Sequence, residues 1–282
     1  MSWNAVASFG PKAFHDLRLA ARDVAARRRP APADLAETSA QDLYLAPHFD
    51  DICFSLGAFV HRRRQGMLLT LFSRSAYVAR PRTIAAEGDE RIAVISNLRQ
   101  REDLTFAREA GLTSRFGGLD EAPLRGRGPF EAARADEDAR LLGDAVIDAI
   151  FAARPEEPGG RRPWLFCPMA IGGHLDHLVV LKTVLRHHEA LRTRWRIAFY
   201  EDLHYAAAWR ARADGLLRFQ SLAASLRLRR SFWPIGEAAG KLALVALYPS
   251  QFVEPPRSIR PFTPAQFIPT PVHEGLWSAD EP

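Results

Sequence analysis

Two short clusters of histidine and aspartate have side chains of the types that bind metal ions. They are His48, Asp50 and Asp51 in the segment APHFDD, and His174, Asp176 and His177 in the segment GGHLDH. Each cluster follows a short apolar run that stops at or just after a proline, and apolar residues resume directly after it. Histidine and aspartate ligands with one position left open are typical of catalytic zinc sites.

Helix capping is the competing explanation for each cluster. An aspartate at a helix start commonly caps the helix and stabilises it by about 1 kcal/mol, and Asp50 or Asp176 alone fits that role. Capping needs one such residue per helix and leaves the three histidines and Asp51 unexplained. Burying two carboxylates and three imidazoles in one crevice is costly unless they share a cation. The two clusters together therefore favour a metal site.

Short apolar strands alternate with amphipathic helices along most of the chain. Strands are expected at 43–46, 67–72, 164–168 and 195–202. Helices are expected at about 52–64, 89–112, 139–153, 176–191, 206–229 and 236–247. This alternation predicts a three-layer α/β/α fold with a mostly parallel sheet. Ligands bind beyond the carboxyl ends of the strands in such sheets, which is where both clusters would lie.

The pattern divides the chain into three parts. Residues 1–40 are expected to form a helical extension and a linker, because a helical periodicity there gives way to a segment rich in proline and alanine. Residues 41–252 are expected to form the catalytic domain, and residues 253–282 a proline-rich tail on its surface.

The composition is that of an ordinary globular protein, with 47% hydrophobic and 25% charged residues, which excludes a wholly disordered chain. The formal net charge is +5, but the arginine runs lack interleaved aromatic residues, so no nucleic-acid partner is expected. The sequence shows no secretory signal and no apolar stretch long enough to span a membrane. Cys53 and Cys167 lie in apolar segments, so we expect buried, reduced thiols and a cytoplasmic location.

The two clusters resemble the paired motifs of the LmbE-like, or PIG-L, zinc-dependent de-N-acetylases, usually His-Pro-Asp-Asp-Glu and His-x-Asp-His. The resemblance extends over about 43–251 and includes, in the family's order, LRQREDLTFAREAGL, LDEAPLRG, FYEDLHYA and LYPSQF. Each minor motif is weak alone, but their common order makes the resemblance specific. It implies a Rossmann-like fold and one zinc ion per chain, with another divalent metal as the alternative.

The resemblance also implies roles for the residues of both clusters. The metal ligands would be His48, Asp51 and His177. Asp50 would be the general base that takes a proton from the zinc-bound water. His174 would act as a general acid or stabilise the oxyanion, and Asp176 would orient a neighbouring histidine.

Three further residues are expected to contact the substrate: Arg99, Glu201 and Asp202. Arg99 matches the family's Arg-x-x-Glu helix, although a surface ion pair with Glu102 is the competing interpretation. Glu201 and Asp202 follow the strand at 195–202 and would hydrogen-bond sugar hydroxyls, brace a histidine of the metal site, or cap a helix.

The sequence departs from the family pattern at several positions. Phe49 stands where proline is usual, and Ile52 where glutamate is usual. The glycine pair at 172–173 occupies the place where sugar-linked members often have a tyrosine. Tyr205 and Tyr248 are the candidates to replace it, with simple packing as the favoured interpretation.

The sequence therefore predicts a zinc hydrolase that removes an N-acetyl or other N-acyl group from an amino sugar or glycoside-like metabolite. The first alternative is an amidase that acts on a non-sugar amide with the same site. The second is a catalytically silent sugar-binding relative. A nucleotide-binding domain is disfavoured because the first strand is followed by His48 and aspartates rather than by the glycine fingerprint. The expected partner is a small N-acylated sugar or glycoconjugate, and the oligomeric state is left open.

Overall fold

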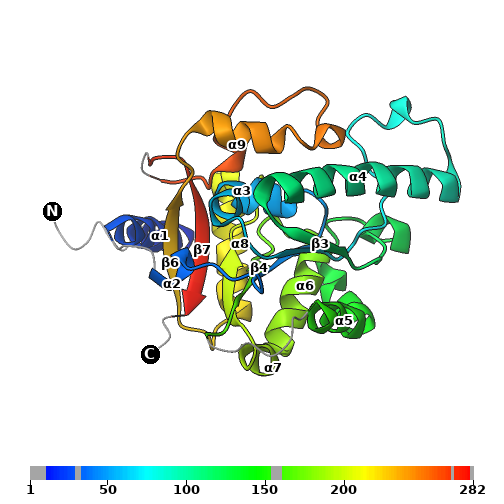
Figure 1. Ribbon diagram of the computed structural model, residues 1–282. Coiled ribbons are helices and arrows are strands. Elements are labelled where there is room, and N and C mark those ends of the chain that lie inside the picture. Colours follow the sequence, from blue (N-terminus) through cyan, green and yellow to red (C-terminus); the bar gives the residue numbers. More distant parts are fainter. Residues whose placement is uncertain (1–10, 29–32, 154–160, 268–269, 280–282) are drawn as a thin grey trace, which may run out of the picture.

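One seven-stranded sheet organises the protein, whose computed structural model describes residues 11–28, 33–153, 161–267 and 270–279. The strands are β1 Leu43–Ala46, β2 Met67–Thr70, β3 Thr113–Phe116, β4 Trp164–Pro168, β5 Arg196–Tyr200, β6 Leu228–Pro234 and β7 His273–Ala279. Their order in the sheet is β3-β2-β1-β4-β5-β7-β6 (Figure 1). The first five are parallel, and β7 is antiparallel to both β5 and β6.

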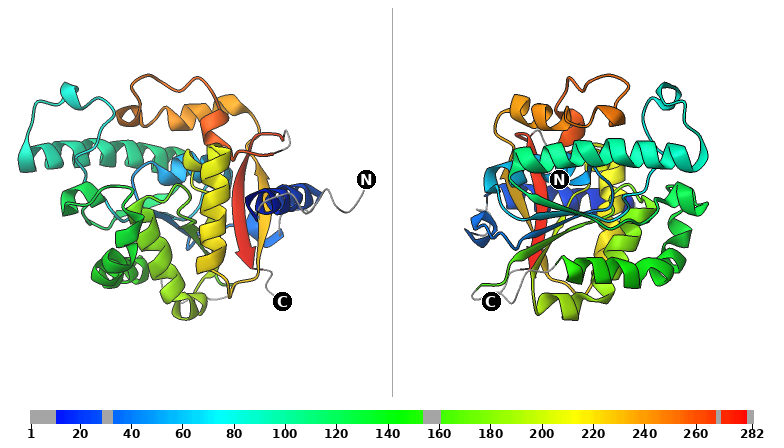
Figure 2. Two further views of the ribbon diagram at one scale, coloured as in Figure 1. Left: turned by 180° about the vertical axis from the view of Figure 1, so that it is seen from behind. Right: turned by 45° about the vertical axis from the view of Figure 1, so that its right-hand side comes forward.

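Helices cover both faces of the sheet, as expected for a three-layer fold (Figures 1 and 2). The helices are α1 Pro11–Arg28, α2 Ala33–Ala36, α3 Asp51–Arg63, α4 Gly88–Ala110, α5 Ala135–Ala152, α6 Leu175–Arg186, α7 His188–Arg192, α8 Trp209–Leu222 and α9 Ala238–Val245. One apolar core joins the sheet to α5, α6 and α8. The other joins its second face to α3, α4 and α9. The expected α/β architecture is confirmed.

The sequence pattern missed three strands, β3, β6 and β7. The expected helix at 206–229 is in fact a short 3₁₀ turn, Tyr205–Ala207, followed by α8, and β6 begins at Leu228. Residues 253–282, which we expected to form a surface tail, supply β7, and this strand lies between β5 and β6. The sheet thus extends beyond the boundary that we placed at residue 252.

Helix α3, which starts at Asp51, is interrupted at Leu56, where the backbone leaves the helical conformation. The N–H groups of Ala58 and Phe59 donate to the carboxylate of Glu274 at 2.9 and 2.8 Å. Lys241 forms an ion pair with the same carboxylate. Side chains from α9 and β7 thereby satisfy polar groups at the interruption, as buried backbone requires.

Four charged side chains and a tryptophan form a buried group on the β6 side of the molecule, which we call the arginine cluster: Asp23, Glu201, Arg212, Arg230 and Trp277. Arg212 lies 2.7 Å from Asp23 and 2.6 Å from Glu201, and Arg230 lies 2.6 Å from Glu201. Because Asp23 belongs to α1, these contacts attach the N-terminal helix to β6, the edge strand (Figure 2, left).

Two expectations from composition concern thiols and membranes. Cys53 and Cys167 are both free and buried. Among the helices that the structure describes, none combines the length and the apolar character needed to cross a membrane.

Candidate metal centre

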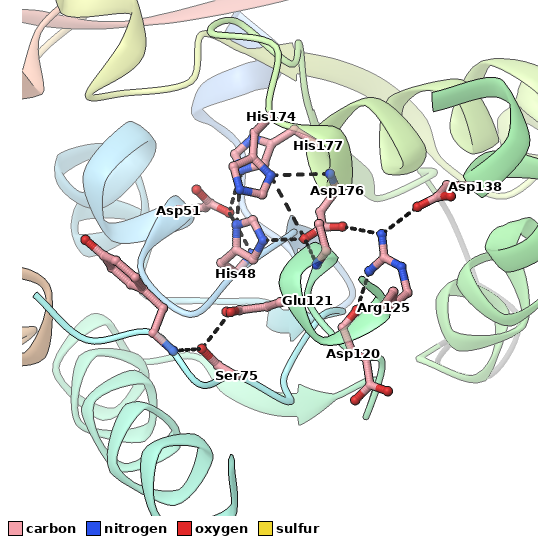
Figure 3. A network of polar contacts seen from close by, with 12 residues as sticks. His48, Asp51, Ser75, Asp120, Glu121, Arg125, Asp138, His174, Asp176 and His177 are labelled. Atoms are coloured by element: carbon pink, nitrogen blue, oxygen red, sulfur yellow. Dashed lines mark hydrogen bonds and ion pairs between the residues drawn. The ribbon is translucent and has the colours of Figure 1, made fainter. Parts of the chain in front are cut away.

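The two histidine and aspartate clusters meet at the carboxyl edge of the sheet. Strands β1 and β4 are parallel neighbours, with Leu43 opposite Leu165 and Tyr44 opposite Phe166. The turns that follow them, one before α3 and one before α6, therefore leave the sheet side by side. Figure 3 shows the side chains of both turns pointing toward one another.

Capping does not explain the aspartates. Asp50 occupies the N-cap position of α3, but its side chain makes no capping hydrogen bond. At α6 the N-cap is His174, whose Nδ1 accepts a hydrogen bond from the backbone N–H of Asp176 at 3.3 Å. The Asp51 carboxylate closes the first turn by accepting from the backbone N–H of His48 at 2.7 Å. Asp50 and Asp176 are thus available for other contacts.

Three atoms converge at the centre of the site: His48 Nδ1, Asp51 Oδ2 and His177 Nε2. Asp51 Oδ2 lies 3.5 Å from His48 Nδ1 and 3.3 Å from His177 Nε2, and the two nitrogens are 3.3 Å apart. Ligand bonds of about 2.0–2.1 Å in a tetrahedral zinc site put neighbouring ligand atoms about 3.3–3.4 Å apart. The triangle therefore has the dimensions of one face of a zinc coordination sphere.

His174 offers a second donor set. Ring nitrogens of His48, His174 and His177 all lie within 4.8 Å of one another, which is also compatible with a shared metal ion. The two sets have His48 and His177 in common and differ in the third ligand. The spacings of 3.3–3.5 Å in the Asp51 set match those of a single tetrahedral ion.

A carboxylate holds the far nitrogen of each central histidine. Asp176 Oδ2 lies 2.9 Å from His48 Nε2, and Asp202 Oδ1 lies 2.7 Å from His177 Nδ1. Carboxylates only accept, so these nitrogens carry protons, and in the neutral rings the opposite nitrogens present lone pairs to the centre. Carboxylate partners of this kind fix the tautomer and orientation of metal-binding histidines.

The turn Ala122–Arg125 in turn holds Asp176. The backbone N–H of Ala122 donates to Asp176 Oδ2 at 3.0 Å, and Arg125 Nη2 donates to Oδ1 at 2.8 Å (Figure 3). The same nitrogen of Arg125 contacts Asp138 at 2.8 Å. Arg125 lies within the motif LDEAPLRG, but the sequence alone gave it no role.

Asp50 lies beside the triangle and is held by Arg99. Asp50 Oδ1 is 3.2 Å from Arg99 Nη2, while Arg99 Nη1 donates to Glu121 at 2.5 Å and to Ser75 at 2.8 Å. Arg99 is only 3% exposed, and Glu102 accepts from Ser250 instead, so the surface pair between Arg99 and Glu102 does not form.

The surrounding charges shift the pKa values of the histidines in opposite directions. Burial by itself lowers the pKa of His177, but Asp51 and Asp202 outweigh it and raise the pKa to about 9. His48 behaves alike, because Asp176 and Asp51 raise its pKa well above the usual value in spite of burial. Burial and the neighbouring charges of His48 and His177 lower the pKa of His174 to about 2. The centre thus favours positive charge between its carboxylates.

A cavity of about 330 Å³ opens above this centre. Its polar lining includes His48, Asp50, Asp51, Arg99, Glu121 and His174. Its other walls include Phe54, Tyr77, Phe130, Tyr205 and Phe252, which the sequence interpretation did not place at the site, apart from Tyr205 as a candidate. Arg99 therefore belongs to the cavity lining, and its contact with substrate stays a prediction.

The structure separates the two acidic residues that follow β5. Asp202 braces His177, one of the roles considered for it, and is only 1% exposed. Glu201 is fully buried in the arginine cluster and does not line the cavity. Tyr248 is likewise buried, and its hydroxyl donates to Asp103 at 2.7 Å.

The residues that depart from the family motif are both in the core. Phe49 is 1% exposed, with the guanidinium of Arg99 5.2 Å from its ring centre. Ile52 is also 1% exposed and packs in the apolar core on the α3 side of the sheet. Neither side chain reaches the cavity lining, so both substitutions change the support of the site rather than its surface.

Comparison with known proteins finds deacetylases, although no family model matches the chain. A 2'-N-acetylparomamine deacetylase from Streptomyces fradiae is 35% identical over 177 residues, which are 58% of this chain and 57% of that protein. The chain thus matches little more than half the length of this curated relative.

Solved structures show the same fold. The zinc-inhibited form of the teicoplanin deacetylase Orf2 has a TM-score of 0.54 at 18% identity and covers 84% of this chain and 97% of its own. A deacetylase–teicoplanin complex gives 0.56 at 19% identity, covering 86% and 100%. The A40926 pseudoaglycone deacetylase Dbv21 gives 0.52 at 18% identity, covering 85% and 96%.

Proposed function

We propose that this chain, a relative of the LmbE-like, or PIG-L, de-N-acetylases, is itself a metal-dependent amide hydrolase that removes an N-acetyl or N-acyl group from an amino sugar. The relationship was expected from the paired motifs, and the similarity to the deacetylases described above supports it. The free, buried Cys53 and Cys167 support a reducing compartment, and we place the reaction in the cytoplasm.

The observation that carries the proposal is the triangle of His48 Nδ1, Asp51 Oδ2 and His177 Nε2, with edges of 3.3–3.5 Å. Two nitrogen donors and one carboxylate oxygen fit catalytic zinc, which keeps a fourth position open. We assign these three residues as ligands. A zinc ion held there supplies a Lewis acid for the acyl carbonyl and lowers the pKa of water.

Asp50 is the general base in this proposal. Its Oδ1 is 3.2 Å from Arg99, which leaves Oδ2 to accept the proton of the attacking water. Arg99 is anchored by Glu121 and Ser75, so it holds the Asp50 carboxylate at the edge of the cavity. A base fixed in this way keeps the orientation that proton transfer needs.

His174 is the hydrogen-bond donor on the other side of the cavity floor. Its Nδ1 accepts from the backbone N–H of Asp176, so Nε2 carries the proton of the neutral ring. From there it donates a hydrogen bond to the acyl oxygen as negative charge develops. The proton that the departing amine needs is the one that Asp50 took from the water. Asp176 and Asp202 keep His48 and His177 in the tautomers that face the centre.

The Asp50→Asn variant tests this assignment. The variant should keep about one zinc per chain, while turnover falls by about 10²–10⁴-fold, the usual contribution of a general base. Metal analysis and acetate release measure the two effects. The matched control is Asp148→Asn, on an exposed position of α5, which should change neither. A variant that turns over normally would remove Asp50 as the base.

A substrate panel separates the proposal from its two alternatives. Zinc-loaded protein is assayed for acetate release from 2'-N-acetylparomamine, N-acetylglucosamine and N-acetylcyclohexylamine. An amino-sugar deacetylase hydrolyses at least one of the sugars and not the simple amide. An amidase acts on N-acetylcyclohexylamine as well, and a silent binding protein releases no acetate from any of the three.

A further inference from the structure

The cavity at the metal centre is lined partly by polar side chains, which include the residues of the two clusters and form what we call its polar floor, and partly by aromatic rings. Phe130 is 59% exposed although it lines the cavity, and Tyr77 is 56% exposed there. Exposed aromatic rings beside a cavity are characteristic of ligand-binding surfaces. The reactions proposed above use neither ring.

Phe130 is fixed in place by the second histidine turn. The backbone N–H of Leu175 donates to the carbonyl of Pro129 at 2.7 Å, which ties the loop before Phe130 to the start of α6. The ring of Phe130 meets the rings of His174 and Tyr205 edge-on, with centres 5.5 and 6.1 Å away. Its position relative to the floor of the cavity is therefore set by the fold.

Tyr205 continues this wall because Gly172 leaves room for it. Gly172 has a φ of +93°, and a Cβ at this position would lie 2.4 Å from Cγ of Tyr205. Any side chain at 172 would therefore displace the ring. The same ring meets that of His177 edge-on at 6.1 Å. Tyr205 lines the cavity, and no hydrogen bond of its hydroxyl is found among the described residues.

A second pair of aromatic residues lines the cavity from other elements. Phe54 comes from α3 and Phe252 follows the turn Pro249–Gln251, and their rings are 5.5 Å apart. Together with Phe130, Tyr77 and Tyr205, they make up the aromatic part of the cavity lining. A volume of about 330 Å³ is at the lower end of the range for small-molecule pockets, about 300–1,000 Å³.

The acidic residues of the cavity all have partners within the protein. Asp50 and Glu121 both contact Arg99, at 3.2 and 2.5 Å. Asp51 contacts His48 and belongs to the metal centre. A substrate with several ammonium groups would therefore find no uncommitted carboxylate in the cavity, and desolvating those charges would be costly.

Resting on the proposed deacetylase function, we infer that the substrate is an N-acyl amino sugar joined to an uncharged aromatic aglycone. The acyl amide lies on the polar floor and the aglycone packs between Phe130 and the other rings. This specificity differs from that expected for a polycationic aminoglycoside, whose additional amines the cavity would not neutralise.

Hydrolysis rates test the inference directly. Zinc-loaded full-length protein is assayed with the 4-nitrophenyl and methyl glycosides of N-acetylglucosamine and with 2'-N-acetylparomamine, and the released amine is measured. The expected kcat/KM for the 4-nitrophenyl glycoside is about tenfold above that for the methyl glycoside, the size of one well-packed aromatic contact. It should also exceed that for 2'-N-acetylparomamine.

Phe130→Ala should lower kcat/KM about tenfold for the 4-nitrophenyl glycoside and less than about twofold for the methyl glycoside. The matched control is Phe267→Ala, because Phe267 is 62% exposed but packs on Trp209 outside the cavity. The control should leave both rates unchanged. Equal rates for the two glycosides, or faster hydrolysis of 2'-N-acetylparomamine, would overturn the inference.

A binding measurement distinguishes failure of this inference from failure of the proposed function. The affinity for each glycoside is measured by calorimetry with the wild type and with Phe130→Ala. If no compound is hydrolysed but the aromatic glycoside binds about tenfold tighter through Phe130, the deacetylase function fails and the aromatic site stands. If hydrolysis occurs without any aromatic preference in rate or binding, the function stands and the inference fails.

Discussion

The protein buries two groups of charged residues that differ in the origin of their cations. In the arginine cluster, Asp23 and Glu201 are matched by Arg212 and Arg230. At the metal centre, Asp51 and two further carboxylates face imidazoles whose lone pairs point to a common position. One group is neutralised by the chain itself, whereas in our proposal the other is completed by a metal ion.

Adjacent residues at the end of β5 join these two groups. Glu201 points into the arginine cluster and Asp202 braces His177. Successive side chains leave a strand on opposite faces, so this separation follows from strand geometry. A buried carboxylate is thus not by itself a sign of function, and the difference lies in whether the chain supplies its counter-ion.

Removing a ligand from the metal centre should have the largest effect of any single change. We expect His177→Ala to lose the bound metal and all measurable turnover, because only two of the three converging atoms remain. Metal analysis and acetate release measure the outcome. His61→Ala is the matched control, because the side chain of His61 is 41% exposed and its ion-pair partner, Glu109, does not belong to the metal centre. Full metal content in His177→Ala would show that this triangle is not the site.

The arginine cluster should respond in stability and not in metal content. Arg212→Met leaves Glu201 and Asp23 buried with one cation between them, which should lower the free energy of unfolding by about 3–5 kcal/mol. Urea unfolding measures this loss, and metal analysis should still find about one ion per chain. Arg101→Met, at an exposed position of α4, should cost less than about 0.5 kcal/mol. Loss of metal in a folded Arg212→Met would contradict the separation of the two groups.

The sequence predicted the strands that are local apolar runs and missed the strands whose buried polar residues pair with distant parts of the chain. Strands β1, β2, β4 and β5 were predicted because they are short apolar runs between helices. Strand β6 begins LRRS and β7 begins HEG, and their buried polar residues find partners far along the chain. Such pairings leave no local apolar pattern, so both strands were missed. Strand β3, TSRF, alternates between exposed and half-buried residues at the other edge of the sheet.

In the candidate site, too, the sequence revealed the residues that are contiguous and missed contacts between distant residues. The clusters around His48 and His174 were visible because each is contiguous in sequence. The contacts of Arg99 with Asp50 and of Arg125 with Asp176 join residues about 50 positions apart. Spacing along the chain carries no information about such contacts, so the roles of Arg99 in holding Asp50 and of Arg125 in holding Asp176 could not be assigned from sequence.

A smaller effect is expected where a residue supports the metal centre without binding the ion. Asp202→Asn removes the negative charge behind His177 Nδ1 and should weaken zinc binding about 10–100-fold. Competition with a chromogenic chelator measures the affinity, and Asp144→Asn on an exposed position of α5 is the control. Unchanged affinity would mean that Asp202 serves only to accept the hydrogen bond that the backbone N–H of Ile171 donates to it at 2.9 Å.

The histidine next to the arginine cluster sharpens the comparison with His177. His273 Nε2 accepts from Arg230 at 2.8 Å, and its Nδ1 donates to the carbonyl of Pro271 at 3.0 Å. Burial and the charge of Arg230 lower the pKa of His273 to about 3, against the raised value of about 9 for His177. Among the charged groups around it, Glu201 opposes this shift and Arg212 adds to it.

The lowered pKa makes stability depend on pH with a defined sign. The folded state keeps His273 neutral, while the unfolded state takes up a proton below a pH of about 6.5. The contribution of His273 to the free energy of unfolding is therefore fully present above that pH and is lost as the pH falls toward 3. The loss between pH 7.5 and 5.0 should be about 2 kcal/mol. We expect His273→Gln, which has no titrating group, to show a pH dependence smaller by this amount in urea unfolding. The metal centre contributes equally to both proteins, so its contribution cancels in the difference between variant and wild type. If the two proteins show the same pH dependence of the free energy of unfolding, protonation of His273 does not destabilise the fold.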